Sequence, residues 1–280
     1  MKRAHLHLFG LALVLALAVG TSNRASSATA YTNAVLADNP AVYWNFDEAG
    51  GDAIDQVNGL AADTLVGGAS AARVASTTNG GGVSLGSAAS FSGANSGNFS
   101  AADLTHPGGA AQWATEFWAQ SSNAGGFNYL LGGAGSGNNP AFLQIGGLMQ
   151  YYANGGGVQQ TAGNAPPASS NWQHFVFVVD SAASTTTVYL NGDLWGSQVH
   201  GDAQDPHPFA RLTVGGFSPT ACCENFSGLI DEVAIYDLSN SGDLSAAGLS
   251  IANHYNVPEP GSIALLGLGG LLMLRRRRGV

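Results

Sequence analysis

Basic residues are almost absent from the central part of the chain. Residues 31–256 contain no lysine and only two arginines, Arg73 and Arg211. Because 17 of the 18 acidic residues lie in the same stretch, its formal charge is −15. A surface this acidic repels nucleic acid and anionic lipid, which excludes a function in binding nucleic acid. It remains compatible with divalent cations, which prefer carboxylate and carbonyl oxygens, although solubility alone also accounts for such a charge.

Cysteine is equally scarce, and its placement excludes a disulfide framework. The only two cysteines, Cys222 and Cys223, are adjacent. Neighbouring Cα atoms lie about 3.8 Å apart, closer than the usual ~4.4–6.8 Å of a disulfide, and a bridge between them closes no long loop. A strained vicinal bridge, an intermolecular bridge and two free thiols therefore all stay open.

The C-terminal residues 257–280 combine three features that do not fit a globular domain. An extended stretch is followed by an uncharged apolar run at 261–274 and by four arginines. The residues of the first and third features are Val257, Pro258, Glu259 and Pro260, and Arg275, Arg276, Arg277 and Arg278. Fourteen helical residues span only about 21 Å, against a hydrocarbon core of about 30 Å, so the run is marginal as a permanent transmembrane helix. The arginines hold its far end in the cytoplasm.

In this order the three features resemble the PEP-CTERM sorting signal of Gram-negative bacteria. The resemblance implies an exosortase-type sorting protease as partner, which recognises the motif in the inner membrane and removes the tail. Residues 257–280 would then insert only transiently into the inner membrane. A plain C-terminal membrane anchor is the alternative.

The N-terminus has the pattern of a secretory signal peptide. Lys2 and Arg3 precede an apolar run at 8–20, and Ala28-Thr29-Ala30 supplies a cleavage site of small residues. Other small residues nearby can serve as well, but cleavage after Ala30 would leave Tyr31 as the first mature residue. We therefore expect a signal peptide at 1–30, one folded domain at 31–256 and a sorting segment at 257–280.

The central region has the pattern of an all-β domain. Val42, Trp44 and Phe46 share one face of a half-buried strand at 41–46, and residues 172–180 form the strongest strand pattern. Asn191-Gly192 predicts a two-residue hairpin. Further strands are expected at 83–85, 89–92, 115–119, 129–131, 142–145, 149–152, 187–190, 193–196, 212–216 and 229–236, and a short helix at 245–255. This spacing favours a two-sheet antiparallel sandwich between the terminal apolar targeting helices.

Five blocks, in this order, resemble the laminin-G-like/concanavalin A-like jelly-roll family. They are YWNFDE at 43–48, EFW at 116–118, WQH at 172–174, VYLNG at 188–192 and GLIDEVAIY at 228–236. The resemblance implies a jelly roll of two curved sheets. It does not imply one function, since the fold serves lectins, adhesins, glycosidases and passive spacers.

Relatives in this family often hold a calcium ion, and four acids are its candidate ligands here. They are Asp47, Glu48, Asp55 and Asp231. Strand alternation places Asp231 on one face with Leu229, Val233 and Ile235, where a buried carboxylate needs backbone N–H groups, Arg211 or a metal as partners. Carboxylates that fix turns through backbone amides are the alternative. A second group of His and Asp side chains could bind a transition metal: His200, Asp202, Asp205 and His207. Glycine and proline make this stretch a loop, where solvated side chains are the simpler interpretation.

Three aromatic residues are candidates for an exposed platform that stacks on sugar rings: Trp195, Tyr151 and Tyr152. Trp118 and Trp172 lie in strand patterns and are expected in the core. A catalytic set is missing: jelly-roll glucanases typically present Glu-x-Asp-x-x-Glu on one strand, and the domain has no such pattern. No Gly-x-Ser-x-Gly elbow is present either, so we expect no enzyme.

The sequence thus predicts an exported, non-enzymatic protein whose jelly-roll domain binds extracellular polysaccharide or another surface protein. Its expected location is the inner membrane in transit, then the cell surface or extracellular matrix of a Gram-negative bacterium. A ligand-free structural surface protein and a polysaccharide-active enzyme are the alternatives. A structural Ca²⁺ is the one cofactor considered.

Overall fold

The computed structural model describes residues 30–68, 71–76, 85–93, 98–101, 104, 110–122, 128–133, 141–145, 148–152, 158–160, 170–199, 211–217 and 225–257. The predicted signal peptide before Ala30 and the sorting segment after Val257 lie outside these residues. Cys222, Cys223 and the loop at 200–210 also lie outside them. Among the helices that the structure describes, none has the length and apolar character needed to cross a membrane.

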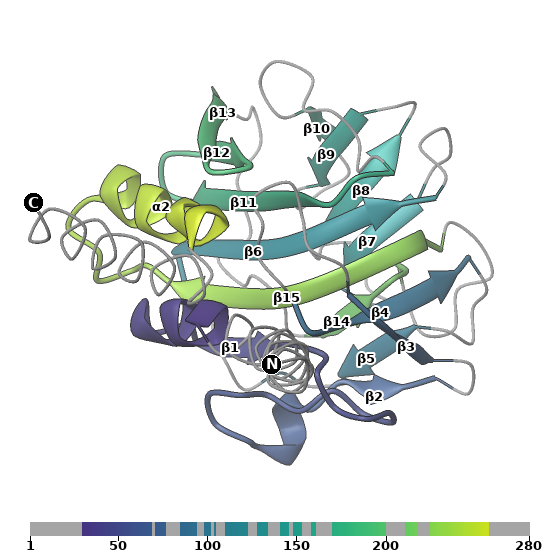
Figure 1. Ribbon diagram of the computed structural model, residues 1–280. Coiled ribbons are helices and arrows are strands. Elements are labelled where there is room, and N and C mark those ends of the chain that lie inside the picture. The colour runs from purple at the N-terminus through teal and green to yellow at the C-terminus, as the bar shows by residue number, and fades with distance from the viewer. Residues whose placement is uncertain are drawn as a thin grey trace, which may run out of the picture.

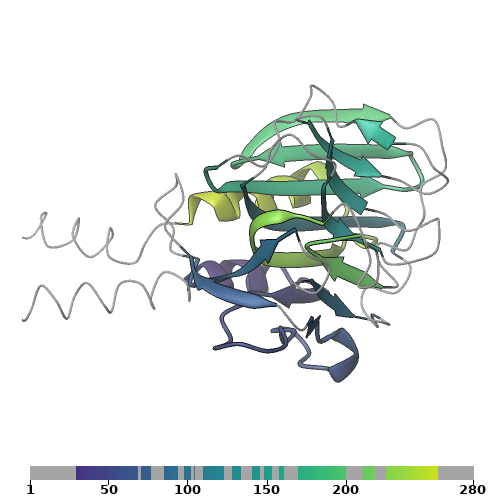
Figure 2. The same cartoon turned by 90° about the vertical axis from the view of Figure 1, so that its right-hand side faces the viewer.

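The domain is a sandwich of two antiparallel sheets, which confirms the expected all-β fold (Figures 1 and 2). The larger sheet has the order β13-β12-β11-β6-β15-β4-β3, and β1 pairs with β15. Its strands are β1 (Val42–Trp44), β3 (Ala72–Ala75), β4 (Ser87–Ser92), β6 (Gln112–Ser121), β11 (Gln173–Asp180), β12 (Thr185–Leu190), β13 (Asp193–Val199) and β15 (Ser227–Asp237).

The smaller sheet has the order β10-β9-β8-β7-β14-β5-β2. Its strands are β2 (Val66–Gly67), β5 (Phe99–Ala101), β7 (Asn128–Gly132), β8 (Ala141–Ile145), β9 (Leu148–Tyr152), β10 (Val158–Gln160) and β14 (Leu212–Val214). Aromatic side chains fill the space between the two sheets. Phe117 stacks on Phe175 and Phe177, with ring centroids 5.5 and 6.1 Å away, and all three are fully buried. Each such ring contributes roughly 1.5–3 kcal/mol by leaving water, so this layer holds the sheets together.

Helices cover the outer face of the larger sheet, opposite the smaller sheet (Figures 1 and 2). They are residues 30–37, α2 (Leu244–Ala252) and the 3-10 turn η3 (Asn253–Asn256); a second 3-10 turn, η1 (Ala61–Asp63), lies elsewhere. The side chain of Asp243 caps α2 by accepting hydrogen bonds from the N–H groups of Ser245 and Ala246. A second hydrophobic cluster lies beneath these helices and includes Tyr31, Val176 and Ile251. The sequence predicted the helix at 245–255 but not the one at 30–37.

The β12–β13 hairpin turns at Asn191-Gly192, as predicted. Asn191 and Gly192 have φ values of 53° and 86°, in the left-handed region that two-residue hairpins require. The turn packs against η3, because a Cβ on Gly192 would lie 3.1 Å from Asn256 Nδ2.

A β-bulge in β15 corrects the predicted position of Asp231. The register between β15 and β6 shifts between Asp231 and Ala234, and Glu232 has a φ of 55°. Leu229 and Asp231 therefore lie on the outer face, whereas Val233 and Ile235 point into the inner core. The predicted common face was wrong because one extra residue interrupts the alternation of side chains.

Candidate ligand-binding pocket

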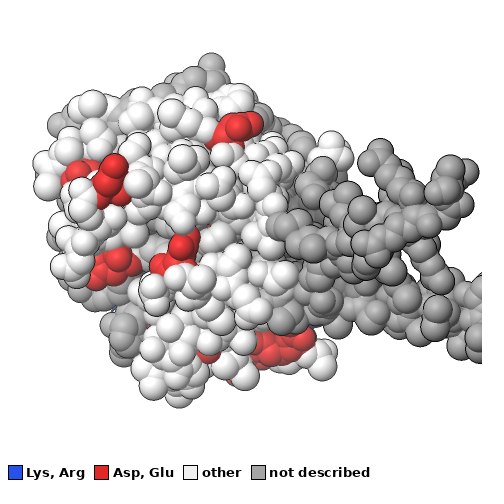
Figure 3. All heavy atoms as spheres, turned by 60° about the vertical axis from the view of Figure 1, so that its left-hand side comes forward, with Lys and Arg blue, Asp and Glu red and all other residues white. Residues whose placement is uncertain are grey.

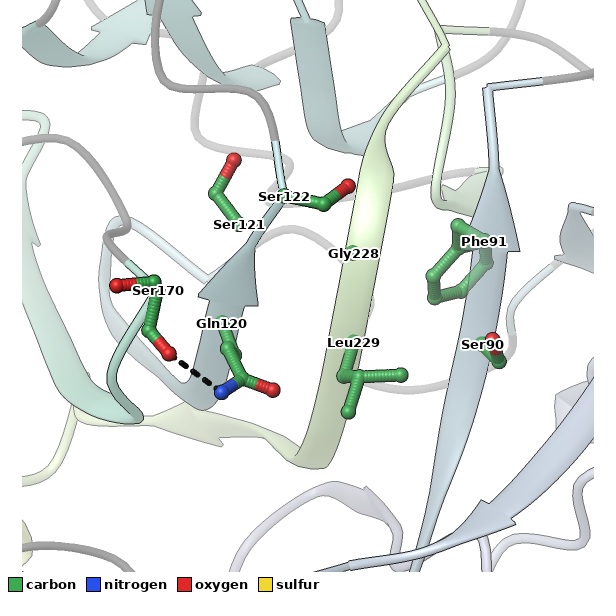
Figure 4. A pocket seen from close by; sticks show the side chains of 8 residues that line it. All are labelled: Ser90, Phe91, Gln120, Ser121, Ser122, Ser170, Gly228 and Leu229. Atoms are coloured by element: carbon green, nitrogen blue, oxygen red, sulfur yellow. Dashed lines mark hydrogen bonds between the residues drawn. The ribbon is translucent and has the colours of Figure 1, made fainter.

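A pocket of about 360 Å³ lies on the outer face of the larger sheet, between β4, β6 and β15 (Figure 4). Its lining residues are Ser90, Phe91, Gln120, Ser121, Ser122, Ser170, Gly228 and Leu229. The face is the outer one, because Leu229 packs against the helix-covered cluster and pairs with Gln120 across the sheet. The neighbouring strand β4 contributes Ser90, which pairs with Leu229 on the other side.

Gly228 allows the strands of the pocket to approach closely. Its φ is 151°, and a Cβ at this position would lie 2.1 Å from the backbone oxygen of Gln120. Any side chain would therefore push β15 away from β6. The far wall is held by the side chain of Gln120, whose Nε2 donates a hydrogen bond of 2.5 Å to the backbone oxygen of Ser170. Ser122 Oγ and Ser227 Oγ are also hydrogen bonded, at 2.7 Å.

The lining combines hydroxyl and amide groups with an apolar surface. None of the described residues that line the pocket carries a charge. Leu229 is partly exposed, whereas Phe91 is buried. Convergent polar groups around an apolar patch are typical of small-molecule sites, and serine and glutamine side chains both donate and accept hydrogen bonds. The pocket therefore suits an uncharged ligand rich in hydroxyl groups.

A fully buried polar cluster lies on the same face, centred on Glu116 of β6. Its carboxylate accepts hydrogen bonds from Tyr236 Oη (2.8 Å), His254 Nδ1 (2.9 Å) and His174 Nε2 (3.3 Å). Burial by itself would raise the pKa of Glu116, but His254 and then His174 outweigh it and lower the pKa to about 2. Glu116 is therefore a carboxylate at neutral pH.

The two histidines of the cluster differ in their partners. His254 lies between two acids, because its Nε2 is 3.3 Å from Asp38 Oδ2 and its Nδ1 faces Glu116. Burial lowers the pKa of His254, but Glu116 and Asp38 outweigh it and raise the pKa. For His174, burial lowers the pKa more than Glu116 raises it, which favours the neutral ring.

Asp231 and Glu232 form the other half of the cluster and are also fully buried. Tyr43 Oη donates to Glu232 Oε2, and Asp231 Oδ1 accepts from the N–H of Glu232 at 2.9 Å. Within the described residues, Asp231 Oδ2 and Glu232 Oε1 have no hydrogen-bond partner. Burial raises the pKa of both carboxyl groups, and the mutual repulsion adds to this for Asp231. Protonation removes the cost of keeping adjacent charges in the core.

The predicted calcium ligands mostly bind backbone amides. Asp55 accepts from the N–H groups of Tyr43, Val57 and Asn58, at 2.9, 3.1 and 2.8 Å. Asp47 accepts from the N–H of Ser87 at 2.7 Å. Glu48 accepts from the N–H of Ile54 at 2.8 Å and contacts Arg73 at 3.4 Å.

These contacts agree with the alternative in which the carboxylates fix turns. In the part of the chain that the structure describes, no group of three or more His, Cys, Asp or Glu side chains is arranged to hold a metal. Calcium binding stays a prediction, and the loop with His200 and His207 lies outside the described residues.

The predicted aromatic platform does not form as a unit. Trp195, 41% exposed, lies on the edge strand β13 of the larger sheet. Tyr151 is 1% exposed and packs against Trp113 and Phe142 between the sheets, so its prediction as an exposed residue was wrong. The side chain of Tyr152 is outside the described part. Trp118 and Trp172 are buried, as expected.

Sequence reasoning missed the pocket itself. Gln120, Ser121, Ser122 and Ser170 come from the end of β6 and from loops, and Ser90 comes from within β4; small polar residues carry no distinctive pattern at these positions. Gly228 was the only signal, since a glycine inside a strand pattern marks a bulge or a close backbone approach.

Residues 77–243 match the concanavalin A-like lectin/glucanases superfamily, and residues 256–278 match the PEP-CTERM protein-sorting motif. No curated protein matches the chain. Among solved structures, domain 4 of AbnA, a GH43 extracellular arabinanase from Geobacillus stearothermophilus in complex with arabinotriose, is similar with a TM-score of 0.55 and 17% identity. That match covers 76% of this chain and 97% of the other.

Two toxin domains are similar as well. The binding domain of Paraclostridial Mosquitocidal Protein 1 has a TM-score of 0.55 and 14% identity, over 78% of this chain and 52% of that one. The Botulinum Neurotoxin serotype G binding domain has a TM-score of 0.54 and 11% identity, over 76% of this chain and 50% of that one. This chain thus spans about half the length of both toxin domains, and at these identities the likeness shows the fold alone. The chain belongs to the concanavalin A-like lectin/glucanases superfamily and carries a C-terminal PEP-CTERM sorting motif.

Proposed function

We propose that this protein is an exported, non-catalytic binding protein whose outer-face pocket holds a neutral carbohydrate. The observation that carries the proposal is the uncharged lining of serine hydroxyls, the Gln120 amide and the Leu229 side chain (Figure 4). Sugar hydroxyls form hydrogen bonds with the serine hydroxyls and the Gln120 amide. The C–H face of a pyranose or furanose ring packs on Leu229. A volume of about 360 Å³ lies in the usual range of ligand pockets, about 300–1,000 Å³.

The charge distribution supports a neutral rather than an anionic saccharide. One face of the molecule shows several carboxylate patches and no visible lysine or arginine (Figure 3). Arg73 is turned inward, where it contacts Glu48 and lies over the rings of Phe46 and Phe99. The formal charge of −15 over residues 31–256 repels uronic acids at long range and leaves neutral sugars unaffected. The similarity to domain 4 of AbnA, described in complex with arabinotriose, adds support for an oligosaccharide.

The burial of the glutamates supports binding without catalysis. Glycoside hydrolysis needs two carboxyl groups on either side of an accessible bond. Glu116 and Glu232 are 0% exposed, and Glu48 is held by Arg73 and the N–H of Ile54. Glu116 and Glu232 therefore cannot reach a substrate. Glu48 is partly exposed, but its carboxylate is engaged by these two contacts, and Glu224 lies outside the described residues.

The sorting motif supports export of the protein through the inner membrane. An exosortase-type protease would cut the tail in the inner membrane and release the domain to the cell surface or the extracellular matrix of a Gram-negative bacterium. Binding of extracellular polysaccharide there is the role we assign to the domain. Binding to a surface protein is the competing hypothesis.

A glycan array probed with the 31–257 fragment, followed by calorimetry, tests the proposal. We expect binding of neutral oligosaccharides and none of uronic acids. Gln120→Ala should weaken binding about fivefold, since a neutral hydrogen bond contributes about 1 kcal/mol. Ser197→Ala, an exposed serine on β13, is the matched control and should bind like the wild type. Binding to no glycan would contradict the proposal, and glycan binding unchanged by Gln120→Ala would exclude this pocket.

A further inference from the structure

The last turn of the domain is fastened to the centre of the larger sheet. In η3, His254 is 4% exposed and its ring lies between Glu116 of β6 and Asp38, as described above. The next residue, Tyr255, stacks on Trp118 with ring centroids 5.6 Å apart and planes 24° apart. A buried, charged hydrogen bond and an aromatic stack thus hold two consecutive residues of one turn.

The N-terminal end of the mature domain completes this attachment. Asp38, which follows the helix at 30–37, accepts a hydrogen bond from Ser250 of α2 at 3.2 Å. The ring of Tyr31 meets the His254 ring edge-on, with centroids 6.0 Å apart, and Tyr31 Oη accepts from Trp118 Nε1 at 2.8 Å. Both ends of the domain therefore lock together over the same face of the sheet.

No spacer separates this turn from the sorting motif. The matched motif begins at residue 256, the last residue of η3, and the N–H of Val257 still donates to the carbonyl of His254 at 3.2 Å. Because three residues span at most about 11 Å, an enzyme that encloses the motif must work within that distance of η3.

We propose that η3 is a gate for tail removal: the turn must open from Glu116 and Asp38 before the sorting protease can grip the motif. The inference rests on the proposed processing by an exosortase-type enzyme. While η3 is closed, the residues before Pro258 are coiled and partly buried, so an enzyme cannot enclose the chain on both sides of the motif. The rate of tail removal then follows the small population of molecules in which the turn is open.

The test compares full-length variants in the native host by pulse-chase, with mass spectrometry of the ends. The first variant inserts a ten-residue Gly-Ser linker between Val257 and Pro258, which adds about 17 Å of mean reach and leaves the domain unchanged. The second, His254→Ala, frees the turn. Leu249→Ala, on the exposed side of α2, is the matched control. The double variant combines the linker with His254→Ala.

We expect the linker to speed cleavage about tenfold. One charge-assisted hydrogen bond reduces the fraction of molecules with an open η3 by about this factor. His254→Ala should speed cleavage to a similar degree and add little once the linker is present, because both changes relieve the same restriction. Equal rates for wild type and linker variant, or slower cleavage with the linker, would overturn the gate. Absence of cleavage in every variant, including the wild type, would instead refute the proposed sorting itself. Resistance of the secreted domain to added protease would show that His254→Ala still folds.

Discussion

Replacing Asp231 by asparagine should flatten the pH dependence of stability. Asp231 is fully buried beside Glu232, its Oδ2 has no partner among the described residues, and burial raises its pKa. A carboxyl group whose folded pKa is raised contributes stability that is fully present below its unfolded pKa, near 4, and is lost as pH rises toward the folded pKa. Asparagine has the same shape, keeps the acceptor for the Glu232 N–H and does not titrate.

The size of the effect follows from counting protons. Each carboxyl that is protonated in the fold but ionised in the unfolded chain lowers the free energy of unfolding by about 1.4 kcal/mol per pH unit. Urea denaturation of the 31–257 fragment between pH 4.5 and 8 measures this slope. Asp231→Asn should reduce this slope by up to about 1.4 kcal/mol per pH unit, which corresponds to one proton. At pH 8 the variant should be more stable than the wild type. Asp237→Asn, exposed at the end of the same strand, is the control. Equal slopes for wild type and Asp231→Asn would show that Asp231 is not protonated in the folded domain.

Four further predictions concern the cluster, calcium and the chain ends. Glu116→Gln should destabilise the domain by about 3–5 kcal/mol in chemical denaturation, because it leaves buried His254 without its main counter-charge. The wild-type contribution of Glu116, whose pKa is about 2, should be present above pH 4.5 and be lost as pH falls toward 2, which acid titration followed by tryptophan fluorescence will show. EDTA should shift the melting temperature by less than about 1 °C if the carboxylates only fix turns, whereas a structural Ca²⁺ would give several degrees. Mass spectrometry of the native protein should find Tyr31 near the start and no residue of 261–280.

The sandwich followed from the sequence because its long strands carry strong patterns. The hairpin at Asn191-Gly192 and the helix at 245–255 have turn and amphipathic signals of their own. The strand β3 (Ala72–Ala75) was missed, since its residues are mostly exposed and show no alternation. The helix at 30–37 was missed because it adjoins the signal peptide and its helical form depends on burying Tyr31 and Val35 against the sheet.

The candidate sites were harder to predict because they depend on register. The bulge at Glu232 places Asp231 and Glu232 on one face beside Glu116, and no local rule of alternation reveals an extra residue in a strand. Tyr151 and Tyr152 alternate along β9, and the sequence does not tell which of the two faces the core. His254 and His174 come together only through the docking of η3, from positions 80 residues apart in the sequence.

The most direct test of carbohydrate binding is to map it onto the structure by NMR. The 31–257 fragment, labelled with ¹⁵N, is titrated with the best neutral oligosaccharide from the array. We expect the largest amide shifts on Ser90, Gln120 and Leu229. Shifts centred on Trp195 and the β13 edge, with these three unchanged, would contradict this expectation.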